Sequence, residues 1–416
     1  MKTDKFKTGC ISVNLVSGLR ADTAASSALL PRVLRRGTSE LSDMERIAMA
    51  LDELYGARIE PIIRKKGELH CPGFYADFPD DRYIPHGGQV LEKTVSMLGD
   101  MFLSPDTREG LLRADYIESE KKNLVDDIRA AVNDKRGYSI SRLLEEMCPG
   151  EAYGVHKLGR EEDALIITPE TLTSRYLDLI ANSRIEVFYC GSAEPELIGG
   201  ILCESLLNLP ERGNTPQPKT EIILYPAGSS PKRFKESLDV MQGKLAIGFR
   251  LGKAMEGQPD YPALMVFNSV YGAGDTSKLF LNVREKLSLC YYVGSMIDKH
   301  KGVLIVSSGV EFSDYDAALD EIMTQLRHVK SGDVSDWELK SAKLSVITSI
   351  KQAMDRPGGL EELYFDSTIS EFPCAPDDLC HMVEEVTLDR IVGCSSEVSA
   401  DSIYFLTGEG GDGDYD

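Results

Sequence analysis

Residues 23–38 read TAASSALLPRVLRRGT, and this stretch decides how the rest of the chain is interpreted. Its apolar residues recur at the spacing of one helical face: Leu29, Leu30, Val33 and Leu34. Gly37 and Thr38 then end the predicted helix. Pro31 lacks a backbone N–H, and its ring clashes with the carbonyl group of the preceding turn. We therefore expect the helix to kink or to begin at Pro31.

The composition is that of a soluble globular protein with two or three domains. The chain has 416 residues, of which 42% are hydrophobic and 27% are charged. Its net charge of −21 argues against a nucleic-acid partner, because phosphate binding needs a basic face. We recognise no secretory signal and no apolar run of membrane length. The nine cysteines form no C-x-x-C pair, which predicts reduced thiols and a cytoplasmic location.

The first half of the chain alternates strand and helix patterns. A capping box at 42–45 opens a helix, and Thr168 with Pro169 opens another. The other helices are expected at 87–103, 109–134 and 194–207, and the strands at 8–19, 57–64, 68–77 and 184–190. Prolines and glycines interrupt residues 209–235, which we interpret as an interdomain linker with a short strand at 222–225.

The second half repeats this order. We expect strands at 238–250, 291–297 and 302–310, helices at 260–271, 276–287 and 313–330, and a helix opened by the capping box Ser335–Glu338. Thr171-Leu172 and Thr387-Leu388 precede equivalent strands at an offset of about 217 residues, which indicates internal duplication. The predicted domains are 1–208 and 236–408, joined by linker 209–235 and followed by a disordered acidic tail at 409–416.

The residues that end the first helix, Arg36-Gly37-Thr38, resemble the pitrilysin, insulinase and mitochondrial-processing-peptidase family. In that family an inverted zinc motif, H-x-x-E-H, precedes a similar ending. Further stretches follow the family's order along nearly the whole chain: Tyr153-Gly154, Gly159-Arg160, 167–172, 279–286 and Tyr291. The resemblance implies an α+β fold of the metallohydrolase type shared by LuxS and the processing peptidases. Each of two homologous domains would be a mainly antiparallel sheet with helices packed on one face.

The zinc motif is degenerate when the chain is laid on the family pattern. Ala28 and Arg32 take the two histidine positions, Pro31 takes the glutamate position, and Asp127 takes the third ligand position. Alanine has no lone pair, arginine is permanently positive, and proline cannot accept a proton, whereas catalytic zinc needs three protein ligands and a base. We expect this chain to bind no zinc. Asp127 and the neighbouring Glu120 are then ion-paired or solvated carboxylates, and a chance likeness of an ordinary amphipathic helix is the alternative.

Two other patterns offer little chemistry of their own. The six histidines lie far apart in sequence, and no two of them stand at the i, i+4 spacing of a zinc helix. Gly272-Ala-Gly274 lacks the Gly-Lys-Ser/Thr ending of a phosphate loop. It is similar to a glycine-rich turn of the family that precedes the substrate-binding helix.

Arg284 and Tyr291 are the candidate binding residues that remain. They stand in a segment, REKLSLCY, that resembles the family's second-half motif, in which an arginine and a tyrosine bind the substrate carbonyl. A guanidinium and a phenol are both hydrogen-bond donors, so they suit a peptide carbonyl or an oxyanion. The alternative is an arginine paired with a carboxylate and a tyrosine at the edge of the core.

These features together indicate the non-catalytic subunit of a heteromeric zinc peptidase. We expect the chain to be inactive alone, because the zinc ligands and the base are replaced. A homologous active partner would supply zinc, and this chain would complete the chamber with Arg284 and Tyr291 for peptide substrates. The chain could also form a homodimer when alone. A structural or peptide-binding protein without catalysis is the second hypothesis, and an autonomous peptidase with an unrecognised site is the third.

Overall fold

The computed structural model describes residues 1–85, 88–207, 209–210, 212 and 215–408, so the predicted acidic tail lies outside the described residues. The chain forms two compact units, and each draws on both halves of the sequence. Unit 1 comprises Met1–Ala130, Val155–Lys219 and Ala353–Phe372. Unit 2 comprises Ala131–Gly154, Thr220–Gln352 and the described part of Pro373–Asp416.

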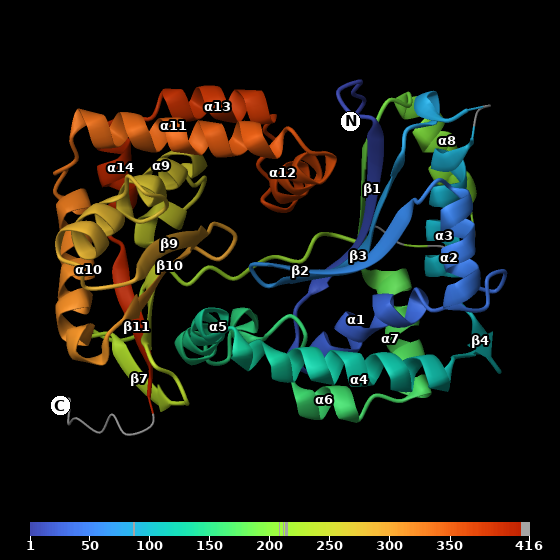
Figure 1. Cartoon of the computed structure of the whole chain (residues 1–416), viewed down its shortest axis with the longest axis horizontal. Helices are drawn as coiled ribbons and strands as arrows, with labels where there is room; N and C mark the ends of the chain where they lie inside the picture. Colours follow the sequence, from blue (N-terminus) through green and yellow to red (C-terminus); the bar gives the residue numbers. More distant parts are fainter. Residues whose placement is uncertain (86–87, 208, 211, 213–214, 409–416) are drawn as a thin grey trace. The chain divides into compact units, whose positions relative to one another are not determined.

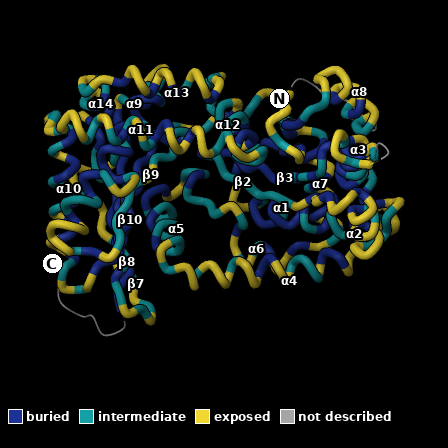
Figure 2. The backbone as a smooth tube through the Cα atoms, turned by 45° about the horizontal axis from the view of Figure 1, so that its top comes forward, coloured by how far each residue is buried: buried dark blue, intermediate teal, exposed yellow. Residues whose placement is uncertain are grey.

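Unit 1 is built on a four-stranded antiparallel sheet in the order β2-β3-β1-β6 (Figure 1). Its strands are β1 (Thr8–Gly18), β2 (Arg58–Lys66), β3 (Leu69–Pro79) and β6 (Arg184–Cys190). β2 and β3 form a hairpin in which Lys66 pairs with Leu69 across a tight turn. β1 lies between β3 and β6, and its residues from Gly9 to Val16 are all buried. Most residues of β3 are buried as well (Figure 2).

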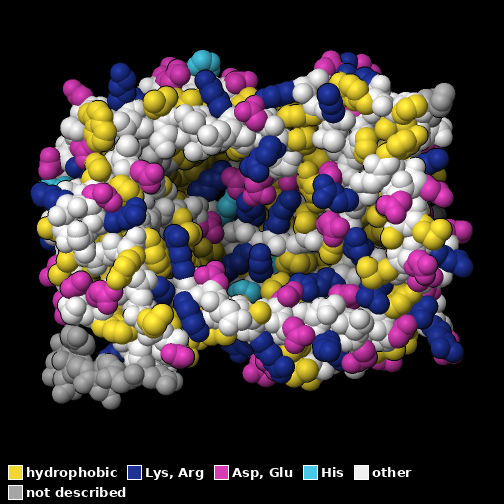
Figure 3. Space-filling model, in the orientation of Figure 1, with side chains coloured by type: hydrophobic (Ala, Val, Ile, Leu, Met, Phe, Trp, Pro, Cys, Tyr) yellow, Lys and Arg dark blue, Asp and Glu magenta, His cyan; other side chains and the backbone are white. Residues whose placement is uncertain are grey.

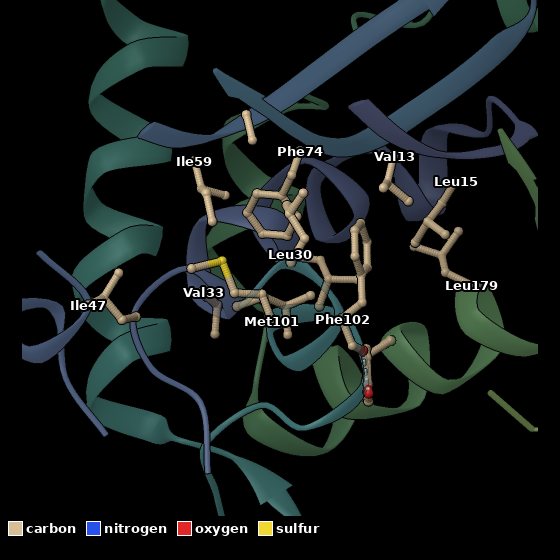
Figure 4. Packing of buried hydrophobic residues seen from close by; sticks show 14 of the residues in the cluster. Val13, Leu15, Leu30, Val33, Ile47, Ile59, Phe74, Met101, Phe102 and Leu179 are labelled. Atoms are coloured by element: carbon tan, nitrogen blue, oxygen red, sulfur yellow. Dashed lines mark hydrogen bonds between the residues drawn. The ribbon is translucent and has the colours of Figure 1, made fainter. Parts of the chain in front are cut away.

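The main core of unit 1 lies between this sheet and a helical layer. α1 (Ala21–Leu34), α3 (Val90–Leu103) and α7 (Pro169–Asn182) supply most of the layer. Leu30 and Val33 of α1 point towards Phe74 of β3 and Phe102 of α3 (Figure 4). The rings of Phe74 and Phe102 meet edge to face, with centroids 5.1 Å apart. The remaining elements are α2 (Met44–Glu53), β4 (Thr107–Arg108), β5 (Leu111–Leu112), α4 (Ala114–Ala130), α6 (Glu161–Leu165) and α8 (Pro195–Ser205).

The opposite face of the same sheet is covered by α12 (Pro357–Ile369), which comes from the second half of the sequence. Phe365 and Ile369 pack on Val16 of β1 and on the first residues of β3. The carboxylate of Glu361 accepts hydrogen bonds from both terminal nitrogens of Arg64, at 2.7 and 2.8 Å, and from the hydroxyl of Ser12 at 2.6 Å. Because both faces are covered, successive residues of β1 are buried regardless of the direction they point.

Unit 2 has a five-stranded sheet in the order β7-β11-β8-β10-β9. All neighbouring strands are antiparallel except β7 and β11. The strands are β7 (Lys232–Ser237), β8 (Gly243–Arg250), β9 (Tyr292–Asp298), β10 (Val303–Val310) and β11 (Ser399–Thr407). The helices from the second half of the sequence are α9 (Tyr261–Tyr271), α10 (Tyr315–Lys330), α11 (Asp336–Ala353), α13 (Pro376–Glu384) and α14 (Leu388–Ser395).

A helix from the first half of the sequence completes unit 2. α5 (Lys135–Met147) packs on β8 and β11, where Leu143 and Met147 contact Ala246 and Tyr404. Phe405, the next residue of β11, instead meets the ring of Tyr315 in α10 at 4.5 Å between centroids. Neighbouring residues of a strand point to opposite faces, so α5 and α10 lie on opposite faces of this sheet. The two units therefore differ from the uninterrupted ranges 1–208 and 236–408 by an exchange of α5 and α12.

Several local predictions need correction. α1 begins at Ala21 and continues through Pro31, so the helix does not begin at the proline. The first residue before α2 is the cap Asp43, which accepts the N–H of Arg46, so the cap is one residue later than predicted. The helix predicted at 109–134 begins later, because α4 starts only at Ala114, after the turn and second strand of the β4–β5 hairpin. The described residues 222–225 form no strand. The caps at Thr168 and Ser335 are confirmed.

Candidate functional site

The four positions that match the zinc motif lie on α1 and α4, which pack against each other in unit 1. Ala28 is fully buried, and Pro31 is buried inside the helix. Arg32 lies one residue beyond the proline and faces α4. Its Nη1 atom is 2.7 Å from Oδ2 of Asp127, so the structure brings two of the four predicted positions into contact.

A second ion pair joins α4 to the segment that directly follows α1. Nη1 of Arg36 is 3.0 Å from Oε1 of Glu120, and the side chain of Glu120 is only 12% exposed. The guanidinium of Arg36 also lies over the ring of Tyr116, 5.5 Å from its centroid. Asp127 and Glu120 are therefore ion-paired carboxylates, the first held by an arginine of α1 and the second by an arginine that follows the end of α1. A guanidinium has no lone pair for a metal, so these residues do not fit a zinc ion.

Histidines do not complete a metal site in the described part of the chain. No group of three or more His, Cys, Asp or Glu side chains there could hold a metal ion. Burial lowers the pKa of His70 to about 4, and burial also lowers the pKa of His156. Both rings are therefore neutral at pH 7, and neither stands beside the Arg32–Asp127 pair in a set of ligands.

The other predicted pair, Arg284 and Tyr291, lies in unit 2. Arg284 is carried by an uncommon element, the π-helix η5 (Leu279–Lys286), and Tyr291 directly precedes β9. π-Helical turns are rare and are frequent at functional sites. Ser288, in the loop between them, has a left-handed backbone with φ of 54°. Both side chains line one surface cavity of about 440 Å³, so the structure brings the pair together.

Among the described residues, the contacts of this cavity engage the hydroxyl of Tyr291 and leave the terminal N–H groups of Arg284 available. The Tyr291 side chain is exposed, and its hydroxyl donates to Oε1 of Glu311 at 2.5 Å. This hydrogen bond raises the pKa of Tyr291, so the phenol keeps its proton at neutral pH. The Arg284 guanidinium lies 4.8 Å from the centroid of the Phe280 ring, and its Nε is 3.7 Å from the adjacent Glu285. Neither side chain belongs to the core, which disfavours the alternative of a core-edge tyrosine.

Glu311 is the residue of this cavity that the sequence analysis missed. It follows the end of β10, twenty residues after Tyr291. The sequence offered one signal for it: strands were predicted at 291–297 and 302–310, and strands that follow each other along the chain usually pair, which sets their ends side by side. In the structure the Tyr291 N–H donates to the carbonyl of Gly309 at 2.9 Å, which fixes this register.

Comparisons with known proteins agree with this combination of fold and degenerate site. The family profile described as "Peptidase M16 inactive domain" matches residues 167–346. A relative from Bacillus subtilis, named "Probable inactive metalloprotease YmfF", is 32% identical over 417 residues, which cover 99% of this chain and 95% of the relative. The chain belongs to the peptidase M16 family, among its inactive members. The resemblance predicted from the sequence is thereby confirmed.

Solved structures show the same fold. A conserved protein from Enterococcus faecalis matches with a TM-score of 0.87 and 24% identity, covering 99% of this chain and 96% of that one. The peptidase M16 inactive domain from Pseudomonas fluorescens matches with a TM-score of 0.78 and 14% identity, covering 98% and 95%. The α+β architecture with two sheet-based units is therefore confirmed. No described helix is both long and apolar enough to cross a membrane.

Proposed function

We propose that this chain is the non-catalytic subunit of a heteromeric zinc-dependent peptidase. The observation that carries the proposal is the contrast between the two units. In unit 1 the position of the metal motif holds the Arg32–Asp127 ion pair. In unit 2 Arg284 and Tyr291 line one cavity. The replaced metal motif in unit 1 and the retained Arg284 and Tyr291 in unit 2 fit a subunit that contacts a substrate, while the zinc that cleaves this substrate belongs to a partner.

The proposed partner is a homologous M16 subunit with an intact H-x-x-E-H motif. Its zinc would supply the hydroxide that attacks the peptide. Arg284 and Tyr291 of this chain would donate hydrogen bonds to the carbonyl oxygen, and these bonds strengthen as negative charge develops there. Tyr291 would exchange its bond with Glu311 for a bond with the substrate. The nine cysteines are all free, which fits a reducing, cytoplasmic setting.

Reconstitution tests this proposal. The native protein is purified from its source, and any co-purifying chain is identified and then expressed. We expect a homologue with the intact motif, and we expect cleavage of a quenched peptide to require both chains. Full activity of the partner alone, or no association between the two at micromolar concentrations, would contradict the proposal.

The alternative is a structural or peptide-binding protein that has lost catalysis. One observation favours it: β2 is the outermost strand of its sheet and pairs only with β3 among the described strands. Its free backbone groups could take an extended peptide as an added strand. Under this alternative a labelled peptide binds the chain without cleavage, whether or not a homologue is added.

A further inference from the structure

A second cavity, of about 440 Å³, opens in unit 1 beside the degenerate zinc position. Its charged lining residues are Arg32, Arg35, Arg36 and Lys157 against Glu60 and Glu120. The lining therefore holds four cationic and two anionic side chains. This excess is unusual in a chain with a net charge of −21. On the face drawn in Figure 3, by contrast, Lys and Arg side chains are interspersed with Asp and Glu side chains.

The acids beside this cavity neutralise it incompletely. Asp127 and Glu60, the partners of Arg32 and Arg35, are 55% and 54% exposed, so water screens them. The two arginine side chains are only 21% and 23% exposed. The positive charges thus lie deeper than two of the three negative charges that balance them. A less polar environment strengthens the field of a charge, so the cavity favours an incoming anion.

Hydrogen-bond donors remain available in the cavity. A guanidinium carries five N–H groups. Arg35 uses Nε for the carbonyl of Ile59 at 2.7 Å and one terminal nitrogen for Glu60 at 3.1 Å. Arg36 uses Nη1 for Glu120, and its buried Nε has no hydrogen-bond partner. The ammonium group of Lys157 forms no ion pair with any described residue.

We propose that this cavity binds an anionic oxygen group, either a carboxylate or a phosphate. Arg32 and Lys157 would meet the anion with charge-assisted hydrogen bonds, and the planar guanidinium groups suit its paired oxygens. The substitution of arginine into the second histidine position then has a chemical consequence beyond loss of zinc. With arginine at this position, this part of the fold can hold an anion in place of a metal cation. The proposal does not rest on the proposed peptidase function, because it needs no partner subunit.

Binding is measured by calorimetry at low salt on the full chain, without a partner. The probes are inorganic phosphate and a short N-acetylated peptide, offered once with a free C-terminal carboxylate and once amidated. We expect saturable binding of phosphate, of the free-acid peptide or of both, weakening as salt is added. Binding of phosphate alone identifies a phosphate site, and binding of the free-acid peptide alone identifies a carboxylate site. Equal binding of the amidated peptide would overturn the proposal.

Variants locate the site. Lys157→Gln changes an exposed side chain and should weaken binding by at least about tenfold. Arg32→Gln should weaken anion binding similarly. If the Arg32→Gln variant folds poorly, the Lys157→Gln variant alone decides. Lys93→Gln is the matched control, because Lys93 is an exposed lysine of the same unit outside the cavity lining. Equal weakening by Lys93→Gln, or no saturable binding of any probe below about 1 mM, would overturn the proposal.

Discussion

The Arg32 guanidinium and the Asp127 carboxylate are 2.7 Å apart and join α1 to α4. A permanent positive charge therefore stands in contact with the carboxylate that matches the third zinc ligand of the family pattern. A metal dication placed there would be repelled by the guanidinium and would have to displace it from Asp127. In the degenerate motif the charges of Arg32 and Asp127 thus neutralise each other.

The first prediction concerns metal content. The purified chain should hold far less than one zinc ion per chain after dialysis against a weak chelator. Arg32→His should not change this, because Ala28 offers no ligand atom and catalytic zinc needs three protein ligands. Elemental analysis of both proteins is the measurement. About one tightly held zinc ion in the wild-type chain would show that the site is elsewhere in the fold.

The second prediction concerns the hydroxyl of Tyr291. With an active partner, Tyr291→Phe should lower turnover by about 100- to 1,000-fold, because it removes one preorganised donor to the oxyanion. Complex formation should persist, since the ring is kept. Tyr225→Phe is the matched control, because Tyr225 is also exposed and donates to a carboxylate, that of Glu397. The measurement is the initial rate of peptide cleavage by the partner with a saturating amount of each variant chain. Equal rates for the two variants would mean that Tyr291 has only a structural role.

The third prediction concerns Arg284. Arg284→Lys keeps the positive charge but loses the planar arrangement of N–H donors. In the same assay we expect a loss nearly as large as that of Tyr291→Phe. A wild-type rate for this variant would mean that charge alone, and not directed hydrogen bonding, is needed at this cavity.

The fourth prediction concerns the buried pair between Arg64 and Glu361. Glu361 is 1% exposed and belongs to α12, so Glu361→Ala leaves the Arg64 charge buried without its main partner. We expect a loss of about 3–5 kcal/mol in the free energy of unfolding. Glu362→Ala, at the next residue, removes a half-exposed carboxylate paired with Lys66 and should cost about 1 kcal/mol or less. Urea denaturation of the two variants compares them, and similar losses would contradict the prediction.

The fifth prediction concerns pH. Burial lowers the pKa of His70 from 6.5 to about 4, so the folded state holds the neutral ring while the unfolded chain takes up a proton. The stability that this difference in pKa gives the folded state is fully present above pH 6.5 and is lost as the pH falls towards 4. The total change in the free energy of unfolding is about 3 kcal/mol. His70→Gln should remove this part of the slope of unfolding free energy against pH. Urea denaturation of both proteins between pH 4 and pH 7 measures the slope, and an unchanged slope in the variant would contradict the prediction.

The sequence predicted those parts of the fold that depend on residues close to one another along the chain. β6 and the cap at Thr168 were located because alternation and capping act over a few positions. The capping box at Ser335 is confirmed for the same reason. The predicted offset of half a chain also drew on local signals, repeated in each half.

The sequence did not reveal which unit each helix joins. Arg64 and Glu361 are separated by 297 residues, and no local pattern connects them. α5 was not predicted: it lies beyond the expected helix at 109–134, and its apolar residues would fit a helical period equally well whichever sheet they cover. The contact of Tyr291 with Glu311 was missed likewise, since the two residues meet only through the pairing of β9 with β10. The Arg284–Tyr291 cavity was anticipated only through resemblance to a family.

The exchange of α5 and α12 also sets the order in which this protein can be completed during synthesis. β1 leaves the ribosome long before α12, the helix that covers its second face and ends at Ile369. Until then Val16, Leu69 and Cys71 have no apolar cover on that face, although the rest of their unit is already present. A nascent chain carrying only the first half would therefore present an uncovered sheet face to the cell, which makes it a substrate for chaperones.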